Sequence, residues 1–178
     1  PNAELKFHGT VWYLAGEGGK DVRETKENIK KLCQIAKRQG YNLLRFHTTD
    51  YLCSSDPAKL AEGFDLFDFL ISEAKKNGIY LNLLIANNVF DDAGKSWDAR
   101  FSSKMKMLMG DEKTRKDWEA HARKQLDHIN PYTGLAWKDD PVFMGMEFWN
   151  EMDLFYTFSG LDAETVALVN SEFAKYAE

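Results

Sequence analysis

The sequence alternates helix-like segments with short apolar segments, and this alternation restricts the fold more than any other feature. Residues 21–39 place apolar side chains at intervals of three and four, Gly40 follows as a helix stop, and residues 41–47 are short, apolar and aromatic. The same order returns in a helix-like segment that ends at Gly78 and is followed by the apolar residues 79–85. Repeated helix–strand alternation of this kind predicts a parallel α/β sheet.

The second half of the chain continues the pattern. A loop predicted for residues 86–110 leads into a helix predicted for residues 111–129. The tract NPYTGLAWKDDP (residues 130–141) breaks this helix, and an apolar strand is predicted for residues 142–149. A last helix follows Asp162, whose carboxylate can cap its first turn.

Two architectures share this pattern: an open doubly wound sheet and a (β/α) barrel. Residues 5–14 form a candidate first strand, although Gly9 weakens it, so the chain holds about four strands. With 178 residues, the chain is shorter than the roughly 250 residues of a typical complete barrel. Length alone therefore favours the open sheet.

Composition narrows the class of ligand. The formal net charge is −5 and the basic residues are scattered, so no surface for nucleic acid is predicted. The four histidines and two cysteines show no metal-ligand spacing, and we predict no metal and no cofactor. No apolar run reaches the length of a membrane span, and the N-terminal PNAELK lacks the order of a signal peptide. A neutral or weakly polar ligand is the natural expectation.

Polar side chains follow the ends of two predicted strands. Arg45 and His47 end the second strand with Asp50 close behind, and Asn150 and Glu151 follow the fourth strand. In parallel α/β folds of either kind, functional groups collect beyond the carboxyl ends of the strands. We therefore expect these residues to line one site.

Three stretches resemble the same family. RFHTTD (residues 45–50), the tract NPYTGLAWKDDP and EFWNE (residues 147–151) look like the retaining glycoside hydrolases of clan A, especially the cellulase-like and mannanase-like proteins of family 5. In that family, an Asn-Glu pair after the fourth barrel strand carries the acid/base carboxylate, and a glutamate after the seventh strand is the nucleophile. The resemblance implies the first half, about four β/α units, of a (β/α)8 TIM barrel.

The resemblance implies a role for each strand-end residue. Glu151 would be the general acid/base, and Asn150 would donate to the sugar hydroxyl beside the reacting carbon. Arg45 would keep the nucleophile ionised, while His47 and Asp50 would line the same pocket. This chemistry needs one protonated and one charged carboxyl, which retaining enzymes hold roughly 5 to 5.5 Å apart.

Aromatic residues near the strand ends are candidate sugar contacts. Sugar rings have apolar faces that pack well on indole and phenol rings. Trp12 and Trp149 are therefore predicted substrate contacts, although Trp149 can equally serve strand packing.

Glu147 is a second carboxylate close to the predicted site. It lies four residues before Glu151, with the same parity along the strand, so it can point into a barrel interior. An unpaired interior charge is costly. We predict that Arg45 is the partner of Glu147.

The resulting prediction is one partial catalytic domain over residues 1–178, from a retaining glycoside hydrolase that acts on a β-linked polysaccharide such as a glucan or a mannan. No glutamate after Glu151 is expected at a strand end, so the nucleophile is missing and the isolated chain should be inactive. Its first and fourth strands would be edges that can pair with another copy. The resemblance also implies a secreted or periplasmic protein.

Two alternatives stay open at this point. The first is a non-catalytic carbohydrate-binding domain that uses the same aromatic residues and Asn150. The second is a complete small α/β protein whose strand-end groups serve another reaction.

Overall fold

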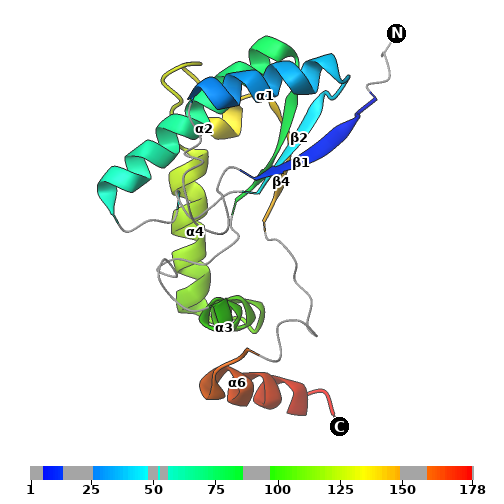
Figure 1. Cartoon of the computed structure of the whole chain (residues 1–178). Helices are drawn as coiled ribbons and strands as arrows, with labels where there is room; N and C mark the ends of the chain where they lie inside the picture. Colours follow the sequence, from blue (N-terminus) through cyan, green and yellow to red (C-terminus); the bar gives the residue numbers. More distant parts are fainter. Residues whose placement is uncertain are drawn as a thin grey trace.

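Four parallel strands form one sheet in the computed structural model, which describes residues 6–13, 26–47, 52, 56–85, 97–148 and 160–177. The strands are β1 (Gly9–Tyr13), β2 (Leu43–His47), β3 (Tyr80–Leu84) and β4 (Phe143–Glu147). They lie in the sheet in sequence order, and all three pairings are parallel (Figure 1). The predicted parallel sheet is confirmed. Sequential order fits a barrel segment, because a doubly wound sheet reverses its strand order at a switch point.

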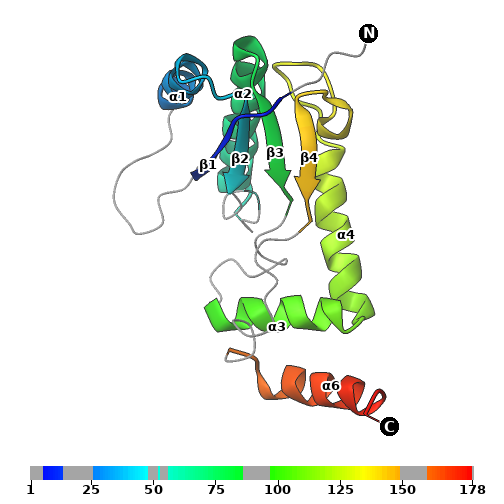
Figure 2. The ribbon, with the colours of Figure 1, turned by 90° about the vertical axis from the view of Figure 1, so that its right-hand side faces the viewer.

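Only some of the helices pack on the sheet. They are α1 (Lys26–Arg38), α2 (Pro57–Asn77), α3 (Trp97–Leu108), α4 (Glu112–Leu126) and α6 (Ala163–Ala174), with a short 3-10 helix at Trp137–Asp139. Figures 1 and 2 show α1 and α2 on one face of the sheet, with α3 and α6 beyond the carboxyl ends of β3 and β4. No helix within these described ranges is long and apolar enough to cross a membrane.

Local chemistry explains where several helices begin and end. The Asp56 side chain accepts from Ala58 N at 2.9 Å at the start of α2, and Gly78 ends that helix with φ of 70°. Gly40 follows α1 with φ of 82°. The left-handed backbone at both positions favours glycine, which has no Cβ to clash. Both predicted glycine stops are confirmed, as is the Asp162 cap of α6, which accepts from Thr165 N at 2.7 Å.

Two predictions about the third cycle are wrong. The segment 86–110, predicted as a loop, contains helix α3. Its buried residues include Ser102, Lys104 and Met105, and α3 packs on α4 and α6 rather than on the sheet. A signal for α3 was present in the sequence, because Trp97, Phe101, Met105 and Leu108 recur at intervals of four and three, the spacing of one helix face.

The second error concerns the end of the next helix. The helix predicted to reach residue 129 ends at Leu126, because Ile129 leaves it to form an antiparallel bridge with Ala136. Ile129 is exposed rather than packed on the buried side of the helix, and His128 follows α4 instead of lying on it.

The hydrophobic core lies between the sheet and the helices α1 and α2. Its buried members are Leu44, Leu81 and Leu83 from the strands, Ile29, Cys33 and Ala36 from α1, and Phe67, Leu70, Ile71 and Ala74 from α2. Cys33 is fully buried, and burial raises the pKa of its thiol to about 12. Cys53 lies outside the described residues.

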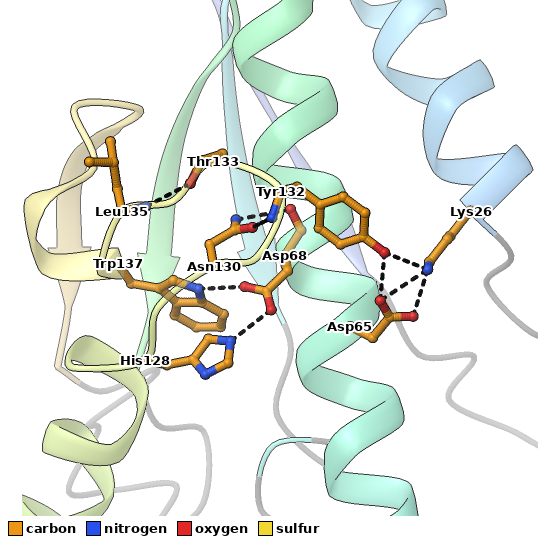
Figure 3. Close-up of polar contacts among 9 residues, drawn as sticks. All are labelled: Lys26, Asp65, Asp68, His128, Asn130, Tyr132, Thr133, Leu135 and Trp137. Carbon is orange, nitrogen blue, oxygen red and sulfur yellow. Dashed lines mark hydrogen bonds and ion pairs between the residues drawn. The ribbon is translucent and has the colours of Figure 1, made fainter.

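The family-like tract at residues 130–141 is also part of this core. Trp137 is fully buried, and its Nε1 donates to Asp68 Oδ1 of α2 at 2.8 Å (Figure 3). His128 Nε2 lies 2.7 Å from Asp68 Oδ2, and Asn130 Nδ2 donates to Asp68 O at 3.0 Å. Burial raises the pKa of the Asp68 carboxyl, although its hydrogen bonds with His128 and Trp137 oppose the shift. The tract therefore anchors the connection before β4 onto α2, at the end of the strand away from the candidate site.

Candidate active site

The strands of the sheet present apolar and polar side chains on opposite faces. Leu44, Leu81 and Leu83 are buried against the helices. Successive side chains of a strand point to opposite faces, so Arg45 and Asn82 lie on the other face. The register confirms that Arg45 of β2 and Asn82 of β3 are neighbours across the ladder. One face of the sheet is thus a helix-packed core and the other is partly polar.

Glu147 joins these residues from β4. The pairing of β3 with β4 shifts between Leu81 and Asn82, so that Asn82 pairs with Gly145 and Leu84 with Glu147. Without this shift, the parity of β4 would be reversed beyond it, and Glu147 would point to the helices. The irregularity therefore brings Glu147 to the same face as Arg45.

Glu147 accepts three hydrogen bonds from two neighbouring strands. Arg45 Nε donates to Glu147 Oε1 at 2.6 Å, and Arg45 Nη2 donates to Glu147 Oε2 at 2.5 Å. Asn82 Nδ2 donates to Glu147 Oε1 at 2.6 Å. The prediction that Arg45 pairs with Glu147 is confirmed, in the bidentate geometry that suits a guanidinium and a carboxylate.

The solvent exposure of this pair limits what it adds to stability. The side chains of Arg45 and Glu147 are 27% and 30% exposed. A pair that water reaches contributes only about 1 kcal/mol or less. Its main physical effect is geometric, because two parallel hydrogen bonds hold the planar guanidinium in one orientation.

The remaining predicted site residues are only partly placed. Trp12 and His47 lie in adjoining strands, where Trp12 pairs with Phe46 and His47 with Tyr13. The side chains of Trp12 and His47 lie outside the described part of the structure. Four predicted site residues lie wholly outside it: Asp50, Trp149, Asn150 and Glu151. Their roles, and the predicted action of Arg45 on a nucleophile, stay predictions.

Asn82 is the site residue that sequence reasoning missed. Its strand, residues 79–85, was interpreted only as an apolar segment. A signal was present, because Asn82 is the one polar side chain in IYLNLLI apart from the tyrosine hydroxyl. A lone amide in a buried strand needs a partner, and the partner proves to be Glu147.

The described residues contain no group of three or more His, Cys, Asp and Glu side chains that could hold a metal ion. Within the described residues, the site offers the carboxylate of Glu147, the amide of Asn82 and the guanidinium of Arg45.

This arrangement defines a class of protein. Helices cover one face of a sequential parallel sheet. A hydrogen-bonded charged cluster occupies the opposite face, with Glu147 at the carboxyl end of β4. Barrel enzymes build their active sites at that end, from residues that several different strands contribute. The chain thus has the organisation of part of a barrel enzyme.

Comparison with known proteins narrows this class. No family model matches the chain. Mannan endo-1,4-beta-mannosidase 3 of Oryza sativa subsp. japonica is 32% identical over 128 residues, which are 65% of this chain and 27% of that protein. Mannan endo-1,4-beta-mannosidase 5 of Solanum lycopersicum is 35% identical over 95 residues, which are 49% of this chain and 23% of that protein.

Solved structures show the same fold. The endo-beta-1,4-mannanase from Thermotoga petrophila has a TM-score of 0.65 at 21% identity, over 98% of this chain and 40% of that one. A glycoside hydrolase family 5 mannosidase from Rhizomucor miehei, solved in complex with mannosyl-fructose, has a TM-score of 0.61 at 16% identity, over 83% of this chain and 44% of that one.

The chain is therefore similar in sequence to plant mannan endo-1,4-beta-mannosidases, and its four strands have the fold of part of the (β/α)8 barrel of solved mannanase structures. It spans about a quarter of the length of the curated relatives that it matches.

Proposed function

We propose that residues 1–178 form one partial domain that supplies the acid/base side of a retaining glycoside hydrolase acting on β-1,4-linked mannan. The main support is the Arg45–Glu147 pair on the face of the sheet opposite α1 and α2. Glu147 is the last residue of β4, and Asn150 and Glu151 follow this strand in the sequence. The similarity to mannan endo-1,4-beta-mannosidases supports mannan over a glucan as the substrate.

In the proposed reaction, Glu151 donates its proton to the glycosidic oxygen as the bond to the anomeric carbon breaks. A nucleophilic carboxylate forms a bond to that carbon, which gives a covalent glycosyl-enzyme. Glu151, now ionised, takes a proton from water, whose oxygen displaces the carboxylate and releases the sugar. Asn150 donates a hydrogen bond to the adjacent sugar hydroxyl, and this bond strengthens in the transition state.

The nucleophile comes from a further part of the barrel in this proposal. Glu164 and Glu172 lie on α6, not at the end of a strand. A polypeptide of these 178 residues alone should therefore not hydrolyse mannan. One carboxylate cannot both protonate the leaving group and attack the anomeric carbon.

We also propose a location for the protein and self-association of the isolated chain. The family resemblance supports a protein that is secreted or periplasmic and meets its polysaccharide there. Within the described residues, β1 and β4 are the outer strands of the sheet, so the isolated chain should self-associate through their edges. Light scattering of the 178-residue chain over a range of concentrations measures this association.

The test is Glu151→Gln in a complete catalytic domain that includes these residues. We expect mannan hydrolysis to fall by about 10² to 10⁴-fold, the usual contribution of a general acid. With a dinitrophenyl mannoside, the rate at which the glycosyl-enzyme forms should fall much less, because dinitrophenolate leaves without needing a proton. Added azide should then speed turnover, since it attacks the glycosyl-enzyme without a base.

The matched control is Glu164→Gln, which removes an exposed carboxylate that pairs with Lys106 at 2.7 Å. This variant should hydrolyse mannan at the normal rate. Hydrolysis retained by Glu151→Gln would refute the proposed role. A complete domain that binds mannan but never cleaves it would favour the carbohydrate-binding alternative.

A further inference from the structure

Arg45, Asn82 and Glu147 form a half-buried cluster that the proposed reaction does not use as an acid, base or nucleophile. Three strands contribute to it, and both Arg45 and Asn82 donate hydrogen bonds to the carboxylate of Glu147. The cluster lies on the open face of the sheet, which is the face opposite α1 and α2. It is therefore not among the core residues that pack against these helices.

The strand register shows which way the guanidinium of Arg45 reaches. Arg45 is level with Asn82, and Asn82 is level with Gly145. Glu147 lies two residues further along β4 and is its last residue. Pairing with Glu147 therefore draws the guanidinium toward the carboxyl ends of the strands, where Glu151 follows in the sequence.

The charges of the cluster also matter for the proposed reaction. A glycosidase transition state has oxocarbenium character, so positive charge develops on the sugar. An uncompensated guanidinium on the same face would oppose that charge. The carboxylate of Glu147 offsets the charge of Arg45, while the amide of Asn82 adds a hydrogen bond without adding charge.

We propose that Glu147 and Asn82 are positioning residues for the mannanase site: they hold the guanidinium of Arg45 at one angle toward the strand ends, and Glu147 offsets its charge. This inference rests on the proposed function. It assigns the two residues roles that act through Arg45 rather than through contact with substrate.

The test uses Glu147→Gln and Asn82→Ala in the complete catalytic domain, with kcat, KM and the pH profile of mannan hydrolysis as readouts. Glu147→Gln removes one negative charge beside Arg45, so the cluster becomes more positive, which favours the ionised form of nearby carboxyls. Both limbs of its pH profile should move to lower pH, and kcat should fall at least about tenfold with little change in KM.

Asn82→Ala separates orientation from charge. It removes one hydrogen bond from Glu147 but no charge, so kcat should fall while both limbs of the pH profile stay in place. The double variant Arg45→Gln/Glu147→Gln restores the charge balance. Its limbs should return to their normal pH although kcat stays low.

The control is Asp117→Asn on α4, which breaks an exposed ion pair with Lys113 at 2.8 Å and should leave every readout unchanged. A Glu147→Gln enzyme with a lower melting temperature but normal kcat and pH limbs would show a purely structural pair and overturn the inference. If Glu147→Gln does not fold, normal kcat in Asn82→Ala overturns it instead. Failure of the proposed function is seen separately, as mannan hydrolysis that survives Glu151→Gln.

Discussion

Lowering the pH from 7 to 4 should destabilise the protein through His121 of α4. This side chain is almost fully buried, and its Nε2 lies 2.6 Å from Gln125 Nε2. Gln125 Nε2 also donates to Ile85 O at 3.1 Å, which sets the orientation of the amide because a carbonyl can only accept. His121 Nε2 must then be the acceptor, so the folded protein holds a neutral ring. A proton on Nε2 would remove that acceptor.

The magnitude follows from the pKa of His121. Burial, helped by the charge of Lys124, lowers this pKa from 6.5 to about 4, although the Ile85 carbonyl opposes the shift. A tenfold change in proton affinity equals about 1.4 kcal/mol, so the difference corresponds to about 3 kcal/mol of folding free energy. Because the folded pKa is depressed, this contribution is fully present above pH 6.5 and is lost as the pH falls toward 4.

The assay compares urea unfolding of the wild-type protein and His121→Leu between pH 7 and pH 4. Between pH 7 and pH 4, the free energy of unfolding of the wild-type protein should fall by about 3 kcal/mol more than that of the variant. Other titrating groups affect both proteins alike when they are distant from His121, so the difference isolates this residue. A direct check is the NMR titration of the His121 ring proton, with a midpoint expected at about 4.

The control Lys124→Gln separates the two causes of the shift. Lys124 is exposed, and its charge is the smaller of the two causes that lower the pKa of His121. This variant should therefore keep most of the pH dependence. Equal pH dependence in wild type and His121→Leu, or a ring that titrates near pH 6.5, would refute the reasoning.

Two further predictions concern stability. Trp137→Phe removes the buried donor to Asp68 and should cost about 3 kcal/mol, a fall in melting temperature of roughly 6 to 12 °C; Tyr132→Phe removes the ring hydroxyl of a half-exposed residue and should cost about 1 kcal/mol or less. If calorimetry showed the same loss of stability in Trp137→Phe and Tyr132→Phe, burial of the hydrogen bond could not be the cause of the larger cost at Trp137. Gly78→Ala should cost about 1 kcal/mol, because only the backbone at φ of 70° resists it and a Cβ there meets nothing within 4 Å. Gly78→Asn should cost less, and the reverse order in thermal unfolding would count against this explanation.

Local patterns in the sequence determined much of the architecture. Apolar spacing and the stops at Gly40 and Gly78 predicted the first two helix–strand cycles, and the observed strands begin or end within a few residues of the predicted ones. These features depend on backbone preferences and on side-chain alternation, which act between residues close in the sequence.

Tertiary packing decided what these local patterns did not contain. Helix α3 has apolar side chains at helical spacing in its own sequence, but its contacts with α4 and α6 decide where it lies in the fold. The register shift at Asn82, which brings Glu147 to the open face, depends on how β3 and β4 pair. The bond from Trp137 to Asp68 joins residues 69 positions apart. Such contacts form only when distant segments meet, and the free energy of that packing is a property of the assembled fold rather than of any one segment.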